Sequence, residues 1–474
     1  MEEHRHDGVQ EEKPSLLEMS TFQLKHCIES LLRFTLALSI EESIDIGLSK
    51  EFCSNLLEED EEDRTYSHTY PSSTSSTGVP PYPLYKHLAS ALCKSIPAGR
   101  IHPMSADMSL IHEDSSSKQQ KCEWNKIIQE KGSDLIKMLE TVQFELHVQE
   151  PFFSQLKDGQ KTIEGRCADG DYNRIESGSS ILFNKCLLLQ VQDVHRYASF
   201  SDMLAAEDLA NVLPGVETVK EVGDNQNNGH VISGTQIYRR FYSEEKERSK
   251  GVLAILLTEP ALQPYDHLGA ILSALHYDGV QRLLGIAHTI GTIPDALPLP
   301  RSTLLHSFSL PHNPDICFLF FFWKPVVFSK TTSLSLGIEV RSAYTPLPRV
   351  RQAGRHYLWV GYNGFVWFTF VYFFSSVLNI GARALAKHVN RSNGKFWGSF
   401  AGSEPQKNML AFKVISNLIA HCCWLNVHIV PPHGAIFEIR VQDGYGARWS
   451  LKPTKFIGFL EPYTKDGYMK GWKH

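Results

Sequence analysis

The sequence predicts a mixed α+β fold, with an N-terminal helical segment, a small central barrel and a small C-terminal α+β domain. The chain has 474 residues, which is too many for one compact core and favours two or three domains. Apolar residues recur at helical spacing in the first third, and from Phe144 onward they alternate with polar residues as in strands. Residues 381–474 again combine helical and strand-like runs, which indicates a further folded unit.

Charge is spread unevenly along the chain, although the formal net charge is only −5. Residues 1–63 hold 5 Lys and Arg against 17 Asp and Glu, whereas residues 381–474 hold 13 against 5. We expect the acidic N-terminal end to suit protein partners and the basic C-terminal end to attract phosphate groups. A solvated basic face that merely balances the acidic end is the alternative.

The nine cysteines include no CxxC pair and no zinc-finger spacing, so we expect reduced thiols in the nucleus or cytoplasm. The N-terminus lacks the apolar run of a secretory signal. His421, Cys422 and Cys423 cluster with His428 and His433, but the tight, irregular spacing favours ordinary core thiols at a helix end over a metal site. No metal, cofactor or membrane partner is predicted.

The acidic segment 1–63 and the following segment 64–143 are predicted to be helical on either side of a linker. Helical spacing of apolar residues predicts four helices, at residues 20–38, 49–57, 84–98 and 124–142. A serine at the start of each of the first two can cap the first turn. Residues 66–83 are rich in Ser, Thr, Pro and Tyr, which is typical of a flexible linker. Gly132 weakens the prediction of the last helix.

The central segment 144–260 is predicted to form a small mixed barrel. Strand-like patterns lie at 144–148, 180–194 and 251–257, helical stretches lie at 151–158 and 200–212, and residues 237–247 are amphipathic. An order of strand, helix, long strand, helix and strand fits a compact barrel and lacks the repeated βαβ spacing of a doubly wound sheet.

A short polar motif follows the first helical stretch of this segment. Residues 156–167 read LKDGQKTIEGRC, with Gly-x-Lys-Thr-x-Glu-x-Arg spacing at Gly159, Lys161, Thr162, Glu164 and Arg166. The motif resembles the signature of the ASCH (activating signal cointegrator homology) family, and the later Tyr238–Phe241 and the closing run GVLAILL also fit. The resemblance covers about a quarter of the chain and implies a PUA-like β-barrel that binds RNA.

The residue types of the motif suit nucleic-acid recognition. Lys161 and Arg166 carry donors and positive charge for a phosphate or a base edge. Glu164 can accept from a base amino group or hold Arg166 in place, and Thr162 adds a hydroxyl. If the motif is extended, alternation places Thr162, Glu164 and Arg166 on one face and Lys161 on the other. The alternative is an internal Glu164–Arg166 ion pair that only fixes a loop.

Two other functions remain open for this motif. Some small bacterial ASCH proteins are amidohydrolases that deacetylate acetylated cytidine with a Lys, a Thr and a Glu, so the resemblance implies Lys161, Thr162 and Glu164 as catalytic candidates. The bacterial threonine stands three residues after the lysine, where this chain has Glu164. The family's glutamate has no firm counterpart, and the candidates are Glu207, Glu244 and Glu245. We therefore expect a binding module and not an enzyme, with a protein-interaction scaffold as the third reading.

Residues 261–313 are predicted to be a helix at 266–285 and a proline-rich connector. Residues 314–380 are anomalous, because aromatic and β-branched residues dominate them with neither helical nor strand period. We interpret this stretch as translated non-coding sequence such as a retained intron, against a short membrane span at 364–380 or a buried insert. Full-length transcripts that lack these codons would support the interpretation, and uniform inclusion would contradict it.

The basic segment 381–474 is predicted to be a small α+β domain. Helical patterns lie at 382–389 and 407–422, and strand patterns at 426–430, 436–441 and 455–459. Arg440 and Arg448, together with Trp449, Lys452 and Lys455, mix basic and aromatic groups as nucleic-acid surfaces do. A protein-docking face is the alternative.

Further candidates lie elsewhere. In the barrel segment Tyr197, Phe200 and Tyr242 are candidates for stacking on bases, although such aromatics more often lie in the core. HYDGVQRLLG at 276–285 and GYGARWS at 444–450 resemble an uncharacterised plant ASCH-domain protein, a wider resemblance that implies no activity. Taken together, the resemblances imply RNA binding in transcription coregulation or RNA processing.

Overall fold

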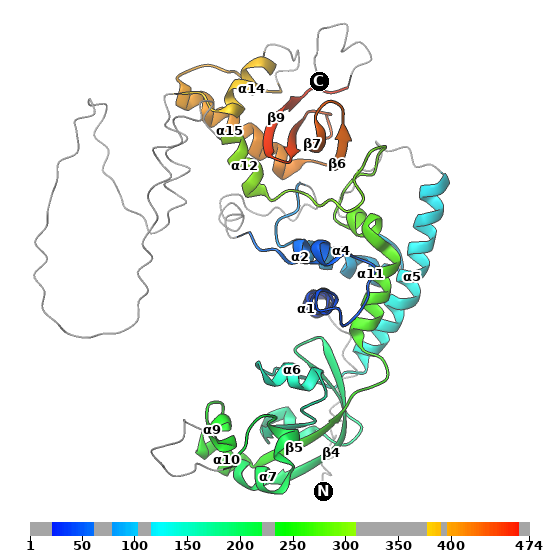
Figure 1. Ribbon diagram of the computed structural model, residues 1–474, viewed down its shortest axis with the longest axis vertical. Helices are drawn as coiled ribbons and strands as arrows, with labels where there is room; N and C mark the ends of the chain where they lie inside the picture. Colours follow the sequence, from blue (N-terminus) through cyan, green and yellow to red (C-terminus); the bar gives the residue numbers. More distant parts are fainter. Residues whose placement is uncertain are drawn as a thin grey trace, which may run out of the picture. The chain divides into compact units, whose positions relative to one another are not determined.

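The computed structural model describes residues 21–60, 78–102, 115–219, 233–309, 377–389 and 396–463. They belong to two compact units. Unit 1 takes the described residues up to Pro300 together with 422–439, and unit 2 takes those of 301–421 and 440–474. Helices and sheets are both present (Figure 1), so the predicted mixed α+β class is confirmed.

The helical part of unit 1 consists of α1 (Thr21–Ile40), α2 (Lys50–Leu57), α4 (Leu84–Ala98), α5 (Ser115–Glu140) and α11 (Pro264–Leu283). The α5 helix packs along α11 (Figure 1), and α1 packs on α2, α4 and α11. The predicted serine cap of α2 is present, because the Ser49 hydroxyl accepts a hydrogen bond from the Phe52 amide. Gly132 does not break α5. A Cβ there would meet the Ile96 side chain at 2.9 Å, so the glycine permits the close approach of α4.

The central sheet of unit 1 is a five-stranded half-barrel at the place of the predicted barrel, for which the sequence indicated only three strand-like runs. Its strands are β1 (Phe144–Leu146), β2 (Ile163–Cys167), β3 (Ser180–Phe183), β4 (Leu187–Tyr197) and β5 (Val252–Thr258), in the order β1-β3-β4-β5-β2. The β1–β3 pair is parallel and the other pairs are antiparallel. The accompanying helices are α6 (Phe152–Lys157), α7 (Phe200–Ala206), α8 (Leu209–Val212), α9 (Gly234–Arg239) and α10 (Glu244–Lys250).

The long strand predicted at 180–194 is instead a hairpin of β3 and β4. The chain reverses at Asn184 and Lys185, whose φ angles of 48° and 62° lie in the left-handed region. The sequence did not predict this turn, because the apolar residues on both sides of it, LLLQV among them, form a nearly continuous run. Apolar composition alone does not reveal a two-residue reversal.

Both faces of the half-barrel are covered. Leu253 and Ile255 of β5 belong to the same core as the helices α1, α4, α5 and α11. Val252 and Ala254 point the opposite way, into a second core formed with Phe200 and other residues of α7, α8 and α9. The helices of the second core bring the segment after residue 233 against β2, which creates the candidate site.

A second sheet contains β6 (Trp424–Val430), β7 (Gly434–Arg440), β8 (Gly446–Leu451) and β9 (Thr454–Leu460), in that order. Unit 2 also holds α12 (Arg301–Ser309), α14 (Ile380–His388) and α15 (Glu404–His421). The sequence did not predict α12 or β8. The β8 strand contains Gly446, Arg448 and Ser450, which have little intrinsic strand preference, so it depends on its pairing with β9.

The aromatic stretch interpreted as a retained intron falls, between residues 314 and 376, outside the described residues. The description resumes at Val377, and the Asn379 side chain caps α14 by accepting a hydrogen bond from the Ala382 amide at 2.7 Å. Among the residues that are described, no helix combines the length and the apolar character needed to cross a membrane.

Candidate functional site

Lys161 lies at the centre of the site and is almost fully enclosed, with 2% of its surface exposed. It stands before β2, which begins only at Ile163, so the strand alternation that would separate Lys161 from Glu164 does not apply. Its ammonium group donates to the carbonyl oxygens of Ile163 at 2.6 Å and Val212 at 2.5 Å. The same nitrogen lies 3.2 Å from Glu164 Oε2. These three acceptors match the three N–H groups of a lysine.

Glu164 lies between two cations. Arg166 Nε is 2.8 Å from Glu164 Oε1, and Arg166 also donates from Nη2 to the His147 carbonyl oxygen at 2.7 Å. Burial lowers the pKa of Lys161, and the neighbouring Glu164 opposes that shift. Burial also acts to lower the pKa of Arg166, but Glu164 and Tyr242 outweigh it and the pKa is raised. The internal Glu164–Arg166 pair considered from the sequence is therefore present.

Aromatic rings form the wall opposite β2. Phe200 stacks on Tyr238 with centroids 4.1 Å apart and on Tyr242 at 5.2 Å. Burial raises the pKa of Tyr238 well above its ordinary value, so its hydroxyl remains protonated. Gly165 permits this arrangement, because a Cβ there would lie 2.4 Å from the Tyr238 hydroxyl oxygen and 2.8 Å from Met203 Cε.

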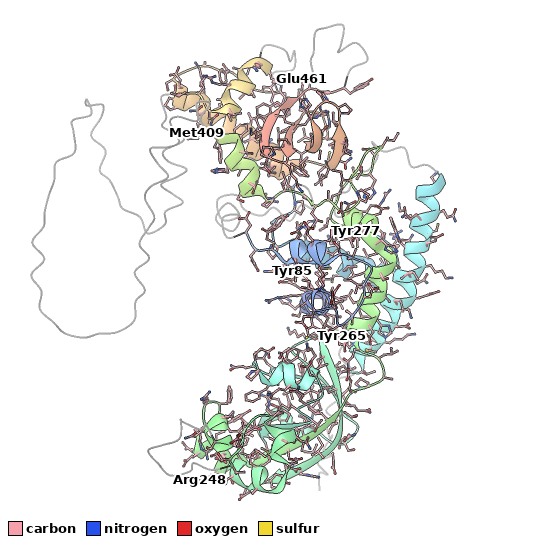
Figure 2. The ribbon with its side chains drawn as sticks, viewed as in Figure 1. Tyr85, Arg248, Tyr265, Tyr277, Met409 and Glu461 are labelled. Carbon is pink, nitrogen blue, oxygen red and sulfur yellow. The ribbon has the colours of Figure 1, made fainter. Side chains whose placement is uncertain are left out.

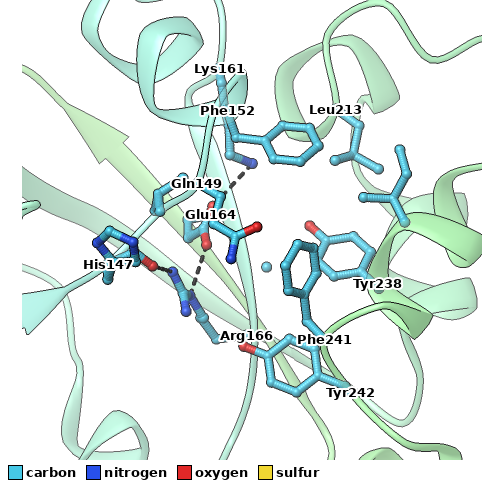
Figure 3. Close-up of a pocket in the computed structure, with 13 residues that line it drawn as sticks. His147, Gln149, Phe152, Lys161, Glu164, Arg166, Leu213, Tyr238, Phe241 and Tyr242 are labelled. Atoms are coloured by element: carbon cyan, nitrogen blue, oxygen red, sulfur yellow. Dashed lines mark hydrogen bonds and ion pairs between the residues drawn. The ribbon is translucent and has the colours of Figure 1, made fainter. Parts of the chain in front are cut away.

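Between β2 and the aromatic wall lies a cavity of about 120 Å³. Figure 3 shows side chains from both sides facing this space, among them Gln149, Phe152, Glu164, Arg166, Tyr238 and Phe241. Phe241 is 47% exposed, which places an accessible ring in the lining of the cavity. The site thus combines a carboxylate, a guanidinium and an amide with several aromatic rings. Figure 2 draws the described side chains as sticks and labels Arg248, which belongs to α10 of this segment.

The segment that holds this cavity, residues 146–261, matches the family model described as the ASCH domain. The half-barrel belongs to the ASCH family. Hypothetical protein PH0355, known from a crystal structure, is 36% identical, with 25% of this chain and 98% of that chain covered and a TM-score of 0.22. Protein PF0455 from Pyrococcus furiosus, known from a solution structure, is 38% identical with the same coverage and a TM-score of 0.21.

Another family model, described as the CdiA C-terminal tRNase toxin domain, matches residues 374–461. This range includes α14, α15 and the whole second sheet. A comparison with curated proteins gives no match.

Three of the four residues predicted as the ASCH site come together. Lys161, Glu164 and Arg166 line the cavity, but Thr162 does not. The Thr162 backbone instead makes two hydrogen bonds to neighbouring segments. Its amide donates to Asn211 O, and its carbonyl accepts from the Leu257 amide.

Of the other acidic and aromatic candidates of the ASCH domain, all except Tyr242 are absent from the lining of the cavity. Glu207 accepts hydrogen bonds from the Tyr197 hydroxyl at 2.7 Å and pairs with His195 at 2.6 Å. Glu244 pairs with Arg248 at 2.8 Å, and Phe200 is a core residue with 1% exposure. Of the proposed stacking residues, Tyr242 lines the cavity. Sequence reasoning missed Gln149 and Phe152, which precede the motif and carried no recognisable signal of their own.

The predicted basic and aromatic surface near the C-terminus is only partly formed. Arg440 forms hydrogen bonds within unit 2. Its Nη1 donates to the carbonyl oxygens of Gly444 at 2.7 Å and Glu461 at 3.2 Å. Trp449 is fully buried and donates from Nε1 to Leu304 O, so it cannot present a surface ring. Arg448 is partly exposed on β8, and Lys455 is exposed on the paired strand β9. Within the described ranges, no group of three or more His, Cys, Asp or Glu side chains could hold a metal ion.

Proposed function

We propose that the ASCH domain binds single-stranded RNA by taking one unstacked base into the cavity beside Glu164 and Arg166. The observation that carries this proposal is a small cavity with aromatic walls and charged groups at one side. Proteins that read single-stranded RNA hold splayed bases in this way, with stacking on aromatic rings and hydrogen bonds to the base edge. Such binding would serve transcription coregulation or RNA processing in the nucleus or cytoplasm.

The size of the cavity favours one small ring. A cavity of about 150 Å³ lined by apolar side chains takes up benzene. The cavity here, at about 120 Å³, is no larger than that and can hold at most a single six-membered ring, whereas drug-sized ligands occupy pockets of about 300 Å³ or more. A pyrimidine base or the six-membered part of a purine meets this limit.

The polar groups of the cavity can form hydrogen bonds with the edge of a bound base. A carboxylate has about four acceptor positions on its two oxygens, and Glu164 has one cation beside each oxygen, Lys161 at 3.2 Å and Arg166 at 2.8 Å. Glu164 thus keeps acceptor capacity for an amino group of a base. The Gln149 amide, which faces the same space in Figure 3, offers both a donor and an acceptor.

Deacylation of acetylated cytidine has less support. Its nucleophile would be Thr162, which does not line the cavity. Its activating base would be Lys161, whose three N–H groups already have acceptors, Glu164 among them. A protein-interaction scaffold would fit the internal Glu164–Arg166 pair, but it does not explain the cavity or the exposed Phe241 ring in its lining.

Binding of the full chain to labelled single-stranded RNA, followed by fluorescence polarisation across a salt series, tests the proposal. Arg166→Ala should weaken binding at least about tenfold, because a hydrogen bond to a charged group contributes about 1.5–3 kcal/mol. Arg174→Ala is the matched control, since Arg174 belongs to the same domain, is 77% exposed and does not line the cavity. Equal affinities of the two variants, or no binding by the wild type at low salt, would overturn the proposal.

RNA cleavage by the C-terminal region is a second candidate function. The observation that favours it is the similarity of residues 374–461 to a family model described as a tRNase toxin domain. The excess of basic over acidic residues in 381–474 suits an RNA substrate. Incubation of the full chain with end-labelled transfer RNA, with and without EDTA, tests this candidate. Fragments of discrete length are the expected result, and intact RNA after extended incubation would contradict it.

A further inference from the structure

Unit 2 carries a strong excess of positive charge. Its described residues hold nine Lys and Arg against three Asp and Glu. One of the three acidic residues, Glu461, is buried and lies 2.8 Å from His388, away from the surface. A surface of this sign attracts polyanions, and RNA is the polyanion that the second candidate function requires. The placement of the cations on the fold indicates where such a ligand can lie.

The hairpin of β8 and β9 belongs wholly to unit 2, and one of its faces is covered. Trp449 pairs with Phe456 across the hairpin, and both side chains are buried. The Trp449 indole donates from Nε1 to Leu304 O of α12 at 3.2 Å. The ring of Phe308, also on α12, stands edge-on to Phe456 with centroids 4.9 Å apart. The helix therefore closes this face to a ligand.

The opposite face of the hairpin carries cations. Because side chains alternate along a strand, Arg448 and Ser450 point away from the side on which Trp449 is buried. Ser450 pairs with Lys455 across the hairpin, so these two side chains share a face. We call this face, with Arg448, Ser450 and Lys455, the outer face. Arg448 is partly exposed and Lys455 is exposed.

The turn of the hairpin adds a further cation and is held in place. Lys452 stands between β8 and β9 and is exposed. The Ser450 hydroxyl donates to Pro453 O at 2.6 Å and accepts a hydrogen bond from the Lys455 amide at 3.2 Å, which fixes the backbone on both sides of the turn. The hairpin as a whole, residues 446–460, contains no Asp or Glu. Among the described residues, neither Lys452 nor Lys455 has an ion-pair partner, so both ammonium groups are available to an anionic ligand.

We infer that the outer face is a docking surface for the phosphate backbone of RNA. A guanidinium can hold a phosphate through two parallel N–H donors, whereas a lysine acts as a point charge, so Arg448 orients the strand and the lysines add attraction. On β8 Arg448 lies two residues from Ser450, the partner of Lys455. Two such positions are roughly 7 Å apart, so the two cations can meet successive phosphates of one strand, and Lys452 can meet the next. This inference rests on RNA as the ligand of the C-terminal region, and it does not require that the region cleave RNA.

The test uses the full chain and a labelled RNA strand in which every base is replaced by an abasic site, so that only the backbone can bind. Polarisation across a salt series gives the slope of log affinity against log salt concentration. Each phosphate contact with a single strand contributes about 0.7 to this slope, so Lys455→Gln should lower it by about 0.7 and weaken binding about fivefold at about 0.1 M salt. A double variant that also carries Lys452→Gln should lower the slope by about 1.4. Both lysines are exposed, so the substitutions leave the packing of the hairpin unchanged.

Two controls separate this surface from other sources of binding. Lys413→Gln removes the same charge from an exposed position of unit 2 on α15, which packs with α12 and α14 on the covered side of the hairpin, and it should leave the slope unchanged. Phe241→Ala should bind the abasic strand as the wild type does, since no base is present to enter the cavity of the ASCH domain.

The outcomes decide between RNA and the other uses of a basic hairpin. An unchanged slope in the lysine variants overturns the inference and leaves the ASCH proposal untouched, because the lysines would then only protect the edge strand β9 from pairing with another chain. Polyglutamate that displaces the abasic strand as well as unlabelled RNA of equal charge does would assign the outer face to acidic protein segments, and this also overturns the inference. Absence of wild-type binding to the abasic strand at low salt overturns it as well, whereas base-dependent binding of ordinary RNA would still support the ASCH proposal.

Discussion

Lys161 Nζ lies 3.2 Å from Glu164 Oε2, and the lysine directs its other two N–H groups to backbone carbonyls. The lysine therefore has an acceptor for each of its N–H groups and holds one oxygen of Glu164 in place. Glu164 in turn holds Arg166 at 2.8 Å. The polar side of the cavity is thus a chain of three lining side chains, in which the buried Lys161 holds Glu164 and Glu164 holds Arg166.

Loss of Lys161 should destabilise the ASCH domain. Lys161→Met leaves Glu164 with one cation in place of two and leaves the Ile163 and Val212 carbonyls without this donor. Breaking a buried pair in this way costs about 3–5 kcal/mol, which urea unfolding of the full chain would measure. Lys157→Met is the control, since the surface pairs of Lys157 contribute at most about 1 kcal/mol. Similar losses for both variants would argue against the supporting role.

Phe241 should contribute to RNA affinity and not to the stability of the fold. Its ring is 47% exposed in the lining of the cavity, so truncation to alanine removes little buried surface. Stacking on one base contributes about 1–3 kcal/mol, so Phe241→Ala should bind at least about fivefold more weakly in a polarisation assay. Leu262→Ala, at a residue that is 54% exposed and outside the cavity, should bind as the wild type does. A Phe241 variant of unchanged affinity would exclude stacking on this ring.

Gly165 should be required for the shape of the cavity. A methyl group at this position meets the Tyr238 hydroxyl and Met203, so Gly165→Ala should displace the aromatic wall and weaken RNA binding. The overpacking should also lower the free energy of unfolding by about 1–3 kcal/mol. Gly458→Ala is the control, because a methyl group added there would have no other atom within 4 Å. Thermal unfolding and polarisation together would show whether Gly165→Ala affects both properties.

Acid should destabilise unit 1 partly through His288. Burial, with a contribution from Arg282, lowers the pKa of His288 to about 4, while Asp278 opposes the shift. The unfolded chain therefore takes up this proton first as the pH falls below about 6.5, so the stabilisation is complete above that value and is lost toward pH 4. Between pH 7.5 and 5 the loss is about 2 kcal/mol.

Urea unfolding at these two pH values would measure the effect. His288→Gln should lose about 2 kcal/mol less than the wild type over this interval, whereas the exposed-site variant His433→Gln should follow the wild type. A His288 variant with the wild-type pH dependence would show that the residue does not titrate differently in the folded and unfolded states.

Local signals in the sequence predicted much of the fold. The helix expected at 84–98 is α4, and Ser49 caps α2 as expected. The fold class and the ASCH family are confirmed. These features depend on short-range periodicity, on caps and on one contiguous motif, all of which are visible along the chain.

Non-local contacts account for what the sequence did not predict. Tyr238 on α9 and Phe241 in the turn that follows it reach the cavity from more than 70 residues after the motif, and no periodicity specifies that approach. Lys161 joins Glu164 because the chain bends before β2 begins, which strand alternation could not anticipate. Trp449 was expected at a surface and lies in a core, because its partner Leu304 belongs to a helix that the sequence did not reveal.

The most direct test of the account compares a short single-stranded RNA with a strand of the same length and charge that carries abasic positions. The central claim is that a base enters the cavity, so the full chain should bind the abasic strand at least about fivefold more weakly, as loss of one stacked base predicts. The two strands carry the same phosphates, so the basic segment 381–474 should attract both equally and a difference in affinity reports the base. Equal affinity for the two strands would contradict the claim and would assign binding to the backbone.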